Sequence, residues 1–273
     1  MNATTVPVEL PRIHATARWS PRLVRAELLK LRKRRGLAGA TLALTIVPMI
    51  VAYIVLVALH AADAVKHGPA GGIENFTGSV NLLGSLTIVA AILVGATAGT
   101  GDLGAGVFRE LVVTGRSRLA LFAARVPAGL GFLLAAVGLA FAFTFVASSL
   151  LAGSLEGPGA QLVAESAGWL ALQAALCFVI ALGVSSLVGS RGTSIGVLLG
   201  FQLVVMPLLL EIGALGVLRE GLVSAAIERF EPGSVLGHPP TVPMSAAAAV
   251  VTVVAWTLVP FALGAWRTYN RDA

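Results

Sequence analysis

Six long runs of apolar residues, separated by short polar connections, dominate the chain. A helix needs about 20 apolar residues to cross the hydrocarbon core of a membrane. Continuous runs favour helices over the alternating strands of a barrel. The predicted spans are residues 37–59, 80–100, 123–152, 168–188, 194–215 and 245–266. The predicted fold class is therefore an all-α integral membrane protein, with one transmembrane domain over residues 20–273 and a flexible cytoplasmic lead-in at 1–19.

A basic amphipathic segment, residues 20–35, precedes the first run. Ser20 followed by Pro21 favours a helix start, because the serine hydroxyl can accept an orphan amide and proline has no amide to lose. On a helical wheel four apolar residues share one side and most cations the other, while Glu27 breaks the pattern. We expect an interfacial elbow helix whose apolar stripe lies in the headgroup boundary. The alternative is a topology signal without a further role.

Composition and charge narrow the class of protein. With 57% hydrophobic and 12% charged residues, the chain is not an ordinary soluble domain, in which about a quarter of residues are charged. The net charge of +6 does not indicate nucleic acid, since the basic residues have no interleaved aromatics. Sixteen of the 19 Lys and Arg residues fall on the cytoplasmic side of a six-span model with both termini inside. The preference for Arg, Ala and Gly is typical of high-GC bacteria, so we expect the bacterial cytoplasmic (inner) membrane.

Polar residues inside the predicted spans are candidates for a translocation path. Such residues normally face the bundle interior, where they bridge helices or contact cargo. Asn81, Gln173, Gln202 and Glu211 are the residues that we expect along a path, and bridging between helices is the alternative for each. No cluster of carboxylates indicates proton or ion coupling.

Glycines at four-residue spacing predict close helix packing. They are Gly95 and Gly99 in the second span, and Gly192, Gly196 and Gly200 in the fifth. Small residues at this spacing let helices approach closely in lipid.

Two connections are more than plain loops. Residues 101–122 combine several glycines, a short amphipathic helix at 107–113 and a turn, which predicts a cytoplasmic coupling hairpin able to dock on a soluble partner. Residues 216–243 alternate apolar and charged positions and predict an external re-entrant segment that Pro232 stops.

Catalytic and metal-binding motifs are weak. Gly99 to Asp102 spell the G-x-G-D string of intramembrane aspartyl proteases, but that chemistry needs a second carboxylate, and Asp63 and Asp272 lie elsewhere. His60, Asp63 and His67 could share a helical face and hold a metal, but Gly68 and Pro69 end any helix immediately after them. The sequence also has no phosphate-binding loop. We therefore expect no catalytic residue, metal or cofactor in this chain.

Two segments carry a resemblance to a known family. ELLKLRKRR (27–35) and GDLGAGVFRELVVTGRSRLALFAAR (101–125) resemble parts of the membrane subunits of ATP-binding-cassette exporters of the ABC-2 type. In that family a basic helix precedes span one. Span two ends in a glycine and an acidic residue, and a short helix and a Ser-Arg turn precede span three. Residues 228–236 are similar to the proline-containing stretch before the last span. The chain departs from the family in Asp102 for Glu, Gly104 for a basic residue and Val107 for Thr.

The resemblance implies a permease subunit that works as a homo- or heterodimer with two separate ATPase subunits. ATP and magnesium would then bind the partner, and the lipid bilayer would be the only other partner, with no nucleic acid. The residues that the resemblance and the hairpin together assign to ATPase coupling are Glu27, Asp102, Arg109, Glu110, Arg116 and Arg118. The alternatives are a membrane scaffold or sensor that transports nothing and an intramembrane enzyme.

Overall fold

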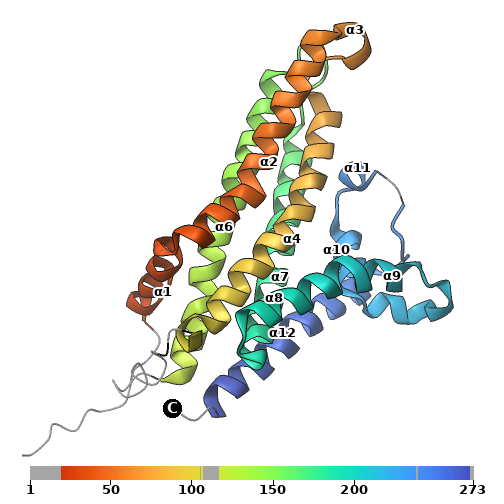
Figure 1. The fold of residues 1–273 in the computed structure, drawn as a ribbon. Helices are drawn as coiled ribbons and strands as arrows, with labels where there is room; N and C mark the ends of the chain where they lie inside the picture. The colour runs from red at the N-terminus through yellow and green to blue at the C-terminus, as the bar shows by residue number, and fades with distance from the viewer. Residues whose placement is uncertain (1–19, 105, 107–116, 238, 271–273) are drawn as a thin grey trace, which may run out of the picture.

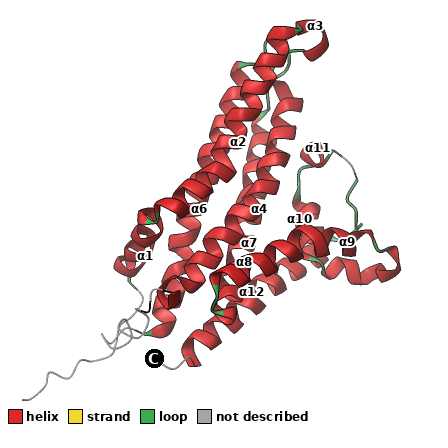
Figure 2. Cartoon of the chain, viewed as in Figure 1, coloured by secondary structure: helices red, strands yellow, loops and turns green. Residues whose placement is uncertain are grey.

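Helices make up all the regular structure in the part of the chain that the computed structural model describes, residues 20–104, 106, 117–237 and 239–270 (Figures 1 and 2). Six helical stretches are long and apolar enough to cross a membrane, so the chain is a multi-pass membrane protein. They are α2 (Arg35–Ala62), α4 (Gly72–Gly104), α6 (Arg118–Leu150), α7 (Ala160–Val188), the stretch Arg191–Glu211, and α12 (Ala246–Asn270). Most are longer than the predicted spans, because backbone hydrogen bonding continues past the last apolar residue.

Helix α1 (Pro21–Lys33) precedes the first span and begins where the sequence predicts. Pro21 occupies its first turn, although the Ser20 hydroxyl makes no capping hydrogen bond. The backbone of Arg34, with φ −78° and ψ 83°, separates α1 from α2. The position of the apolar stripe in the headgroup boundary stays a prediction, and part of the stripe packs on the protein. Leu23 packs on the first turns of α6, against Ala120, Leu121 and Ala124.

Helices α4 and α7 form the centre of the bundle. In each, 67% of the most apolar stretch is buried, against 17% in α2 and 11% in α12. Gly95 and Gly99 lie directly on α7, because a Cβ added to either would meet the α7 backbone within 3 Å. Helices α2 and α6 pack beside this pair (Figure 1). The short α3 (Ala64–His67) lies at the end of the bundle opposite α1.

The glycine repeat of the fifth span does not pack as predicted. Among the described residues, no atom lies within 4 Å of a Cβ added to Gly192, Gly196 or Gly200, so these glycines join no helices in that part of the chain. The close approach between α7 and α12 instead uses Gly183 and Gly264, and a Cβ on Gly264 would meet the Gly183 carbonyl oxygen at 2.8 Å. Neither glycine belongs to a four-residue repeat.

The fifth span is broken into α8 (Arg191–Gly200), a π-helical turn η1 (Phe201–Val205) and α9 (Met206–Glu211). Pro207 explains the break, because its ring clashes with the carbonyl four residues earlier and it donates no hydrogen bond. The Met206 amide accordingly bonds to the carbonyl of Phe201, five residues back. Together with α12, this stretch leans away from the α2, α4, α6 and α7 bundle (Figure 1).

The connection between the fifth and sixth spans folds back along α12. It contains the 3₁₀ segment η2 (Gly213–Gly221), α10 (Val223–Phe230) and α11 (Gly233–Leu236). Thr252 Oγ1 and Trp256 Nε1 of α12 donate to the carbonyls of Glu220 and Gly221 at 2.9 Å each. Trp256 lies ten residues into α12, or about 15 Å along the helix at 1.5 Å per residue. The connection therefore extends alongside the span instead of remaining at its end.

Candidate functional site

A cluster of four charged side chains, three of them buried and Lys30 partly exposed, joins α1 to the facing ends of α4 and α6. Lys30 Nζ donates to Glu27 Oε1 at 2.6 Å and to Asp102 Oδ1 at 2.8 Å, and Arg125 Nη2 donates to Asp102 Oδ2 at 2.9 Å. Glu27, Asp102 and Arg125 are 8%, 5% and 2% exposed. The two anions and two cations balance, which limits the cost of removing them from water. We call these four residues the charge cluster.

The wheel position of Glu27 explains how α1 contributes to the charge cluster. The buried residues of α1 are Leu23, Glu27 and Leu31, spaced by four, so they form one stripe along the helix. Glu27 interrupts the apolar pattern because this stripe faces the protein and needs a carboxylate there for Lys30. The break that Glu27 makes in the apolar pattern therefore corresponds to its contact with Lys30.

Cations also cap the last turn of α4. The last carbonyls of a helix have no intrahelical partner, and the helix dipole places partial negative charge at this end. Arg125 Nη1 donates to the carbonyl of Gly99 at 3.2 Å, and Arg34 Nη2 donates to the carbonyl of Gly101 at 3.4 Å. Asp102 adds a carboxylate at the same helix end, which increases the local need for cations.

Electrostatics keep Lys30 charged. Burial alone would lower its pKa, but the hydrogen bonds from Nζ to Asp102 and Glu27, together with the attraction of both carboxylates, raise the pKa above its ordinary value. A raised lysine pKa means that this contribution to stability is fully present below the unfolded-state value, about 10.4, and is lost only as the pH rises through the higher folded-state value. Lys30 therefore does not titrate near neutral pH.

The other predicted coupling residues fall in two groups. Arg118 begins α6, and its Nη1 donates to the carbonyl of Tyr269 at 2.8 Å, which ties the start of α6 to the end of α12. Arg109, Glu110 and Arg116, like the short helix expected at 107–113, lie outside the described residues, as does the lead-in at 1–19.

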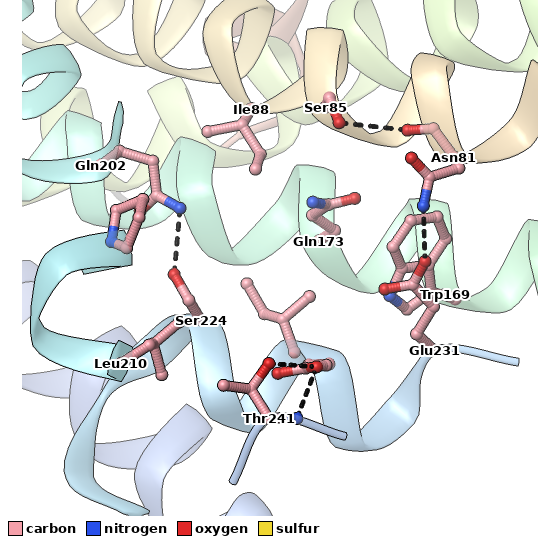
Figure 3. A pocket seen from close by; sticks show the side chains of 13 residues that line it. Asn81, Ser85, Ile88, Trp169, Gln173, Gln202, Leu210, Ser224, Glu231 and Thr241 are labelled. Carbon is pink, nitrogen blue, oxygen red and sulfur yellow. Dashed lines mark hydrogen bonds between the residues drawn. The ribbon is translucent and has the colours of Figure 1, made fainter. Parts of the chain in front are cut away.

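A polar pocket with a volume of about 470 Å³ lies between α4, α7, η1 and α10 (Figure 3). Its walls combine amide, hydroxyl, carboxylate and apolar side chains. Its lining includes Asn81, Ile88, Trp169, Gln173, Gln202 and Glu228. Gln173 lies 13 residues after the start of α7, or about 20 Å along the helix. The polar pocket is therefore well inside the span.

Hydrogen bonds pair some of the polar groups in this pocket. Asn81 Nδ2 donates to Glu231 Oε1 at 3.4 Å, and Gln202 Nε2 donates to Ser224 Oγ at 3.1 Å (Figure 3). Glu228 Oε1 accepts bonds from the amide and the hydroxyl of Thr241 at 2.8 and 2.9 Å. These contacts hold α10 and the segment after it against α4 and η1.

Two buried polar atoms of the pocket walls have no hydrogen-bond partner among the described residues. They are Gln173 Oε1 and Trp169 Nε1, and the two side chains are 4% and 5% exposed. An unpaired polar group in a low-dielectric interior costs about 1–3 kcal/mol. Figure 3 shows the Gln173 side chain near the centre of the pocket, between the Asn81–Glu231 and Gln202–Ser224 pairs.

The structure thus brings together three of the four residues expected along a path. Asn81, Gln173 and Gln202 line one pocket, whereas Glu211 is exposed at the end of α9 and lines none of it. Sequence reasoning missed Trp169 and Glu228. Trp169 lies one turn before Gln173 on the same helix, and this spacing is the signal that could have indicated it.

Of the possible metal-binding residues, Asp63 has a structural role. The Asp63 carboxylate caps α3, where it accepts hydrogen bonds from the amides of Val65 at 3.1 Å and Lys66 at 3.0 Å. Among the described residues, no group of three His, Cys, Asp or Glu side chains is placed to hold a metal ion.

Comparison with known proteins identifies no relative. No protein-family model matches the chain, and no curated protein matches it. Functional inference therefore depends on the charge cluster, the polar pocket and the sequence motifs.

Proposed function

We propose that the chain is the permease subunit of an ATP-driven exporter of the ABC-2 type, in a bacterial cytoplasmic membrane with both termini in the cytoplasm. The observation that carries the proposal is the charge cluster. It links the basic helix α1 to the last turn of α4 and the first turns of α6. The coupling hairpin at residues 101–122, which includes the connection between α4 and α6, is the segment on which we expect an ATPase to dock.

The charge cluster supports a mechanical role for α1. A partner that displaces the connection between α4 and α6 pulls on Asp102 and Arg125, and Lys30 passes that displacement to α1. Since only Arg34 separates α1 from α2, the first span follows. Two copies of the chain, or this chain and a sister permease, then tilt between inward-open and outward-open states while two ATPase subunits bind ATP and magnesium.

The surroundings of Asp102 argue against the intramembrane protease alternative. Both carboxylate oxygens accept from cations, one from Lys30 and the other from Arg125. Acid–base catalysis by an aspartate pair needs two carboxylates that share a proton. Asp63 lies at the α3 end of the bundle (Figure 1). The same contacts suit a residue that transmits force.

A reconstitution experiment tests the proposal. The chain is expressed with the ATP-binding-cassette subunit that the proposal requires, and ATP hydrolysis is measured in proteoliposomes. We expect a stable complex in which the chain stimulates ATP hydrolysis by the ATPase subunit. Lys30→Gln should reduce this stimulation about tenfold, since hydrogen bonds to charged groups are worth about 1.5–3 kcal/mol. Lys33→Gln is the matched control, because Lys33 is exposed on the same helix.

Two results would contradict the proposal. One is the absence of any complex with the ATPase subunit. The other is an intact complex whose hydrolysis responds equally to Lys30→Gln and Lys33→Gln, which would mean that the charge cluster does not couple the two proteins.

A further inference from the structure

We infer that the polar pocket binds an organic cation whose apolar body carries hydrogen-bonding groups. Binding of such a cation is inferred for this chain by itself. The further statement that the cation is the exported cargo rests on the function proposed above. The inference is drawn from the charge of the pocket, from its unpaired polar atoms and from the apolar surface beside it.

The charge of the pocket selects cations. Glu228 and Glu231 are the charged residues among the described residues of its lining, which include no Lys or Arg. Glu228 Oε1 is fixed by Thr241, and this contact holds the carboxylate in place without neutralising it. A carboxylate that is partly withdrawn from water attracts a cation more strongly than one in solution.

The unpaired polar atoms add a requirement for hydrogen bonding. Gln173 Oε1 can accept a bond from an amine or hydroxyl of the ligand, and Trp169 Nε1 can donate to a ligand oxygen or nitrogen. Native structures rarely leave such buried groups without a partner. A ligand that pairs them removes a cost already present in the empty protein.

The apolar surface beside the pocket accommodates the body of the ligand. Ile88, Pro207 and Ile227 contribute apolar walls to the pocket itself. Gln202 also lines a second, almost wholly apolar cavity of about 220 Å³, together with Ile180, Val184 and Trp256. A cation with an aromatic or aliphatic body can therefore place its charge near Glu228 and its carbon skeleton beyond Gln202.

The π-helical turn explains why the two cavities meet at Gln202. Single π-helical turns within α-helices occur frequently at functional sites. Here the turn covers Phe201–Val205, immediately before Pro207. A π-helical turn contains one residue more than an α-helical turn, so it changes which side chains face inward. In this turn Gln202 faces α10 and bonds to Ser224.

Equilibrium binding to the purified full-length chain in detergent tests the inference. Ethidium, a fluorescent organic cation with two amino groups, is the primary probe. Tetraphenylphosphonium and tetraphenylborate are competitors of matched shape and opposite charge, and empty micelles give the background. We expect saturable ethidium binding that tetraphenylphosphonium displaces and tetraphenylborate does not.

Variants assign the binding to the pocket. We expect Glu228→Gln to weaken both cations about tenfold, as the loss of one charge-assisted contact would. Glu211→Gln should change neither, since Glu211 is exposed outside the pocket. Gln173→Leu should weaken ethidium but leave tetraphenylphosphonium unchanged, because the phosphonium ion makes no hydrogen bond.

A filling variant keeps the inference testable if a polar substitution fails to fold. Ile88→Phe should block binding while leaving every charge in place, and Ile54→Phe, at an exposed position of α2, should not. Equal displacement by tetraphenylborate, or ethidium binding that Glu228→Gln and Ile88→Phe leave unchanged, would overturn the inference. None of these measurements uses an ATPase, so their failure differs from failure of the proposed function.

Discussion

Asp102 occupies a position at which an isolated carboxylate would be strongly unfavourable. It is 5% exposed and lies in the last turn of α4, where the helix dipole already places negative charge. Arg125 and Lys30 offset both effects through hydrogen bonds to its two oxygens. The stability of this junction therefore depends on keeping the pairs complete.

Removing one member of the Asp102–Arg125 pair should be more damaging than removing both. Asp102→Asn leaves the buried Arg125 without its counter-ion, and breaking a buried pair in this way costs about 3–5 kcal/mol. We expect a clearly lowered thermal unfolding temperature in detergent. The double variant Asp102→Leu/Arg125→Met should recover part of the loss.

Asp63→Asn is the control for that measurement, because Asp63 caps a short exposed helix and should change stability little. If the losses of Asp102→Leu alone and Arg125→Met alone simply add in the double variant, the pair is not energetically coupled and the charge cluster has no special role.

At the scale of single residues, the sequence indicates half of the charge cluster. Glu27 and Asp102 are visible because each carboxylate interrupts a pattern, a helical stripe in one case and the end of a span in the other. Lys30 and Arg125 are not, because basic residues are common near span ends and nothing local shows that they meet Asp102. Contacts across 72 and 23 residues appear only in the fold.

Among elements, close approaches are made by repeated and by isolated glycines. Gly95 and Gly99 of α4 lie against α7, and Gly183 and Gly264 let α7 and α12 touch, whereas the repeated glycines of α8 face open space among the described residues. A small residue permits close approach only where a second helix is present to use it. The four-residue spacing therefore identifies a smooth helix surface without identifying its partner.

Substituting leucine at two glycines separates these cases. Gly264→Leu places a side chain against the backbone of Gly183, and overpacking of this kind costs about 1–3 kcal/mol or more when backbone must move. Gly196→Leu has open space and gains helix propensity, so it should not destabilise the single chain. Thermal unfolding in detergent measures both.

Equal destabilisation by the two leucines would contradict the glycine assignment. A normal unfolding temperature for Gly196→Leu combined with lost oligomer formation would instead assign the α8 face to a second copy of the chain.

The existence and order of the spans are predictable from hydropathy, and their interruptions are not. Each of the six apolar runs corresponds to one candidate span. The start of α7 at Ala160, eight residues before the predicted start, has no hydropathy signal, since residues 160–167 include Gln161 and Glu165. These side chains bond to each other at 2.8 Å, four residues apart, and extend the helix beyond its apolar part.

At the scale of the whole molecule, an even number of membrane crossings puts the start of the first span and the end of the last span on the same side of the membrane. We expect the six spans to place α1 and the end of α12 on one side of the membrane and α3 on the other. The hydrogen bond from Arg118 to the carbonyl of Tyr269 agrees with this, because it joins the start of α6 to the end of α12.

Labelling of single cysteines with a membrane-impermeant maleimide tests this arrangement in sealed cells or vesicles. Arg32→Cys and Asn270→Cys should label from the same side, and Lys66→Cys from the opposite side. Native Cys177 is buried and gives little background. Labelling of position 66 from the same side as position 32 would contradict six crossings.

The hydrogen bonds from α12 to η2 have a consequence for biosynthesis. The carbonyls of Glu220 and Gly221 receive their partners from Thr252 and Trp256, which the ribosome makes later. Unsatisfied backbone groups are costly within the hydrocarbon region. We expect residues 213–230 to wait at the membrane surface until α12 has inserted, because only then can α10 complete the wall of the polar pocket. The ligand binding that we infer would consequently be acquired only after α12 has been made.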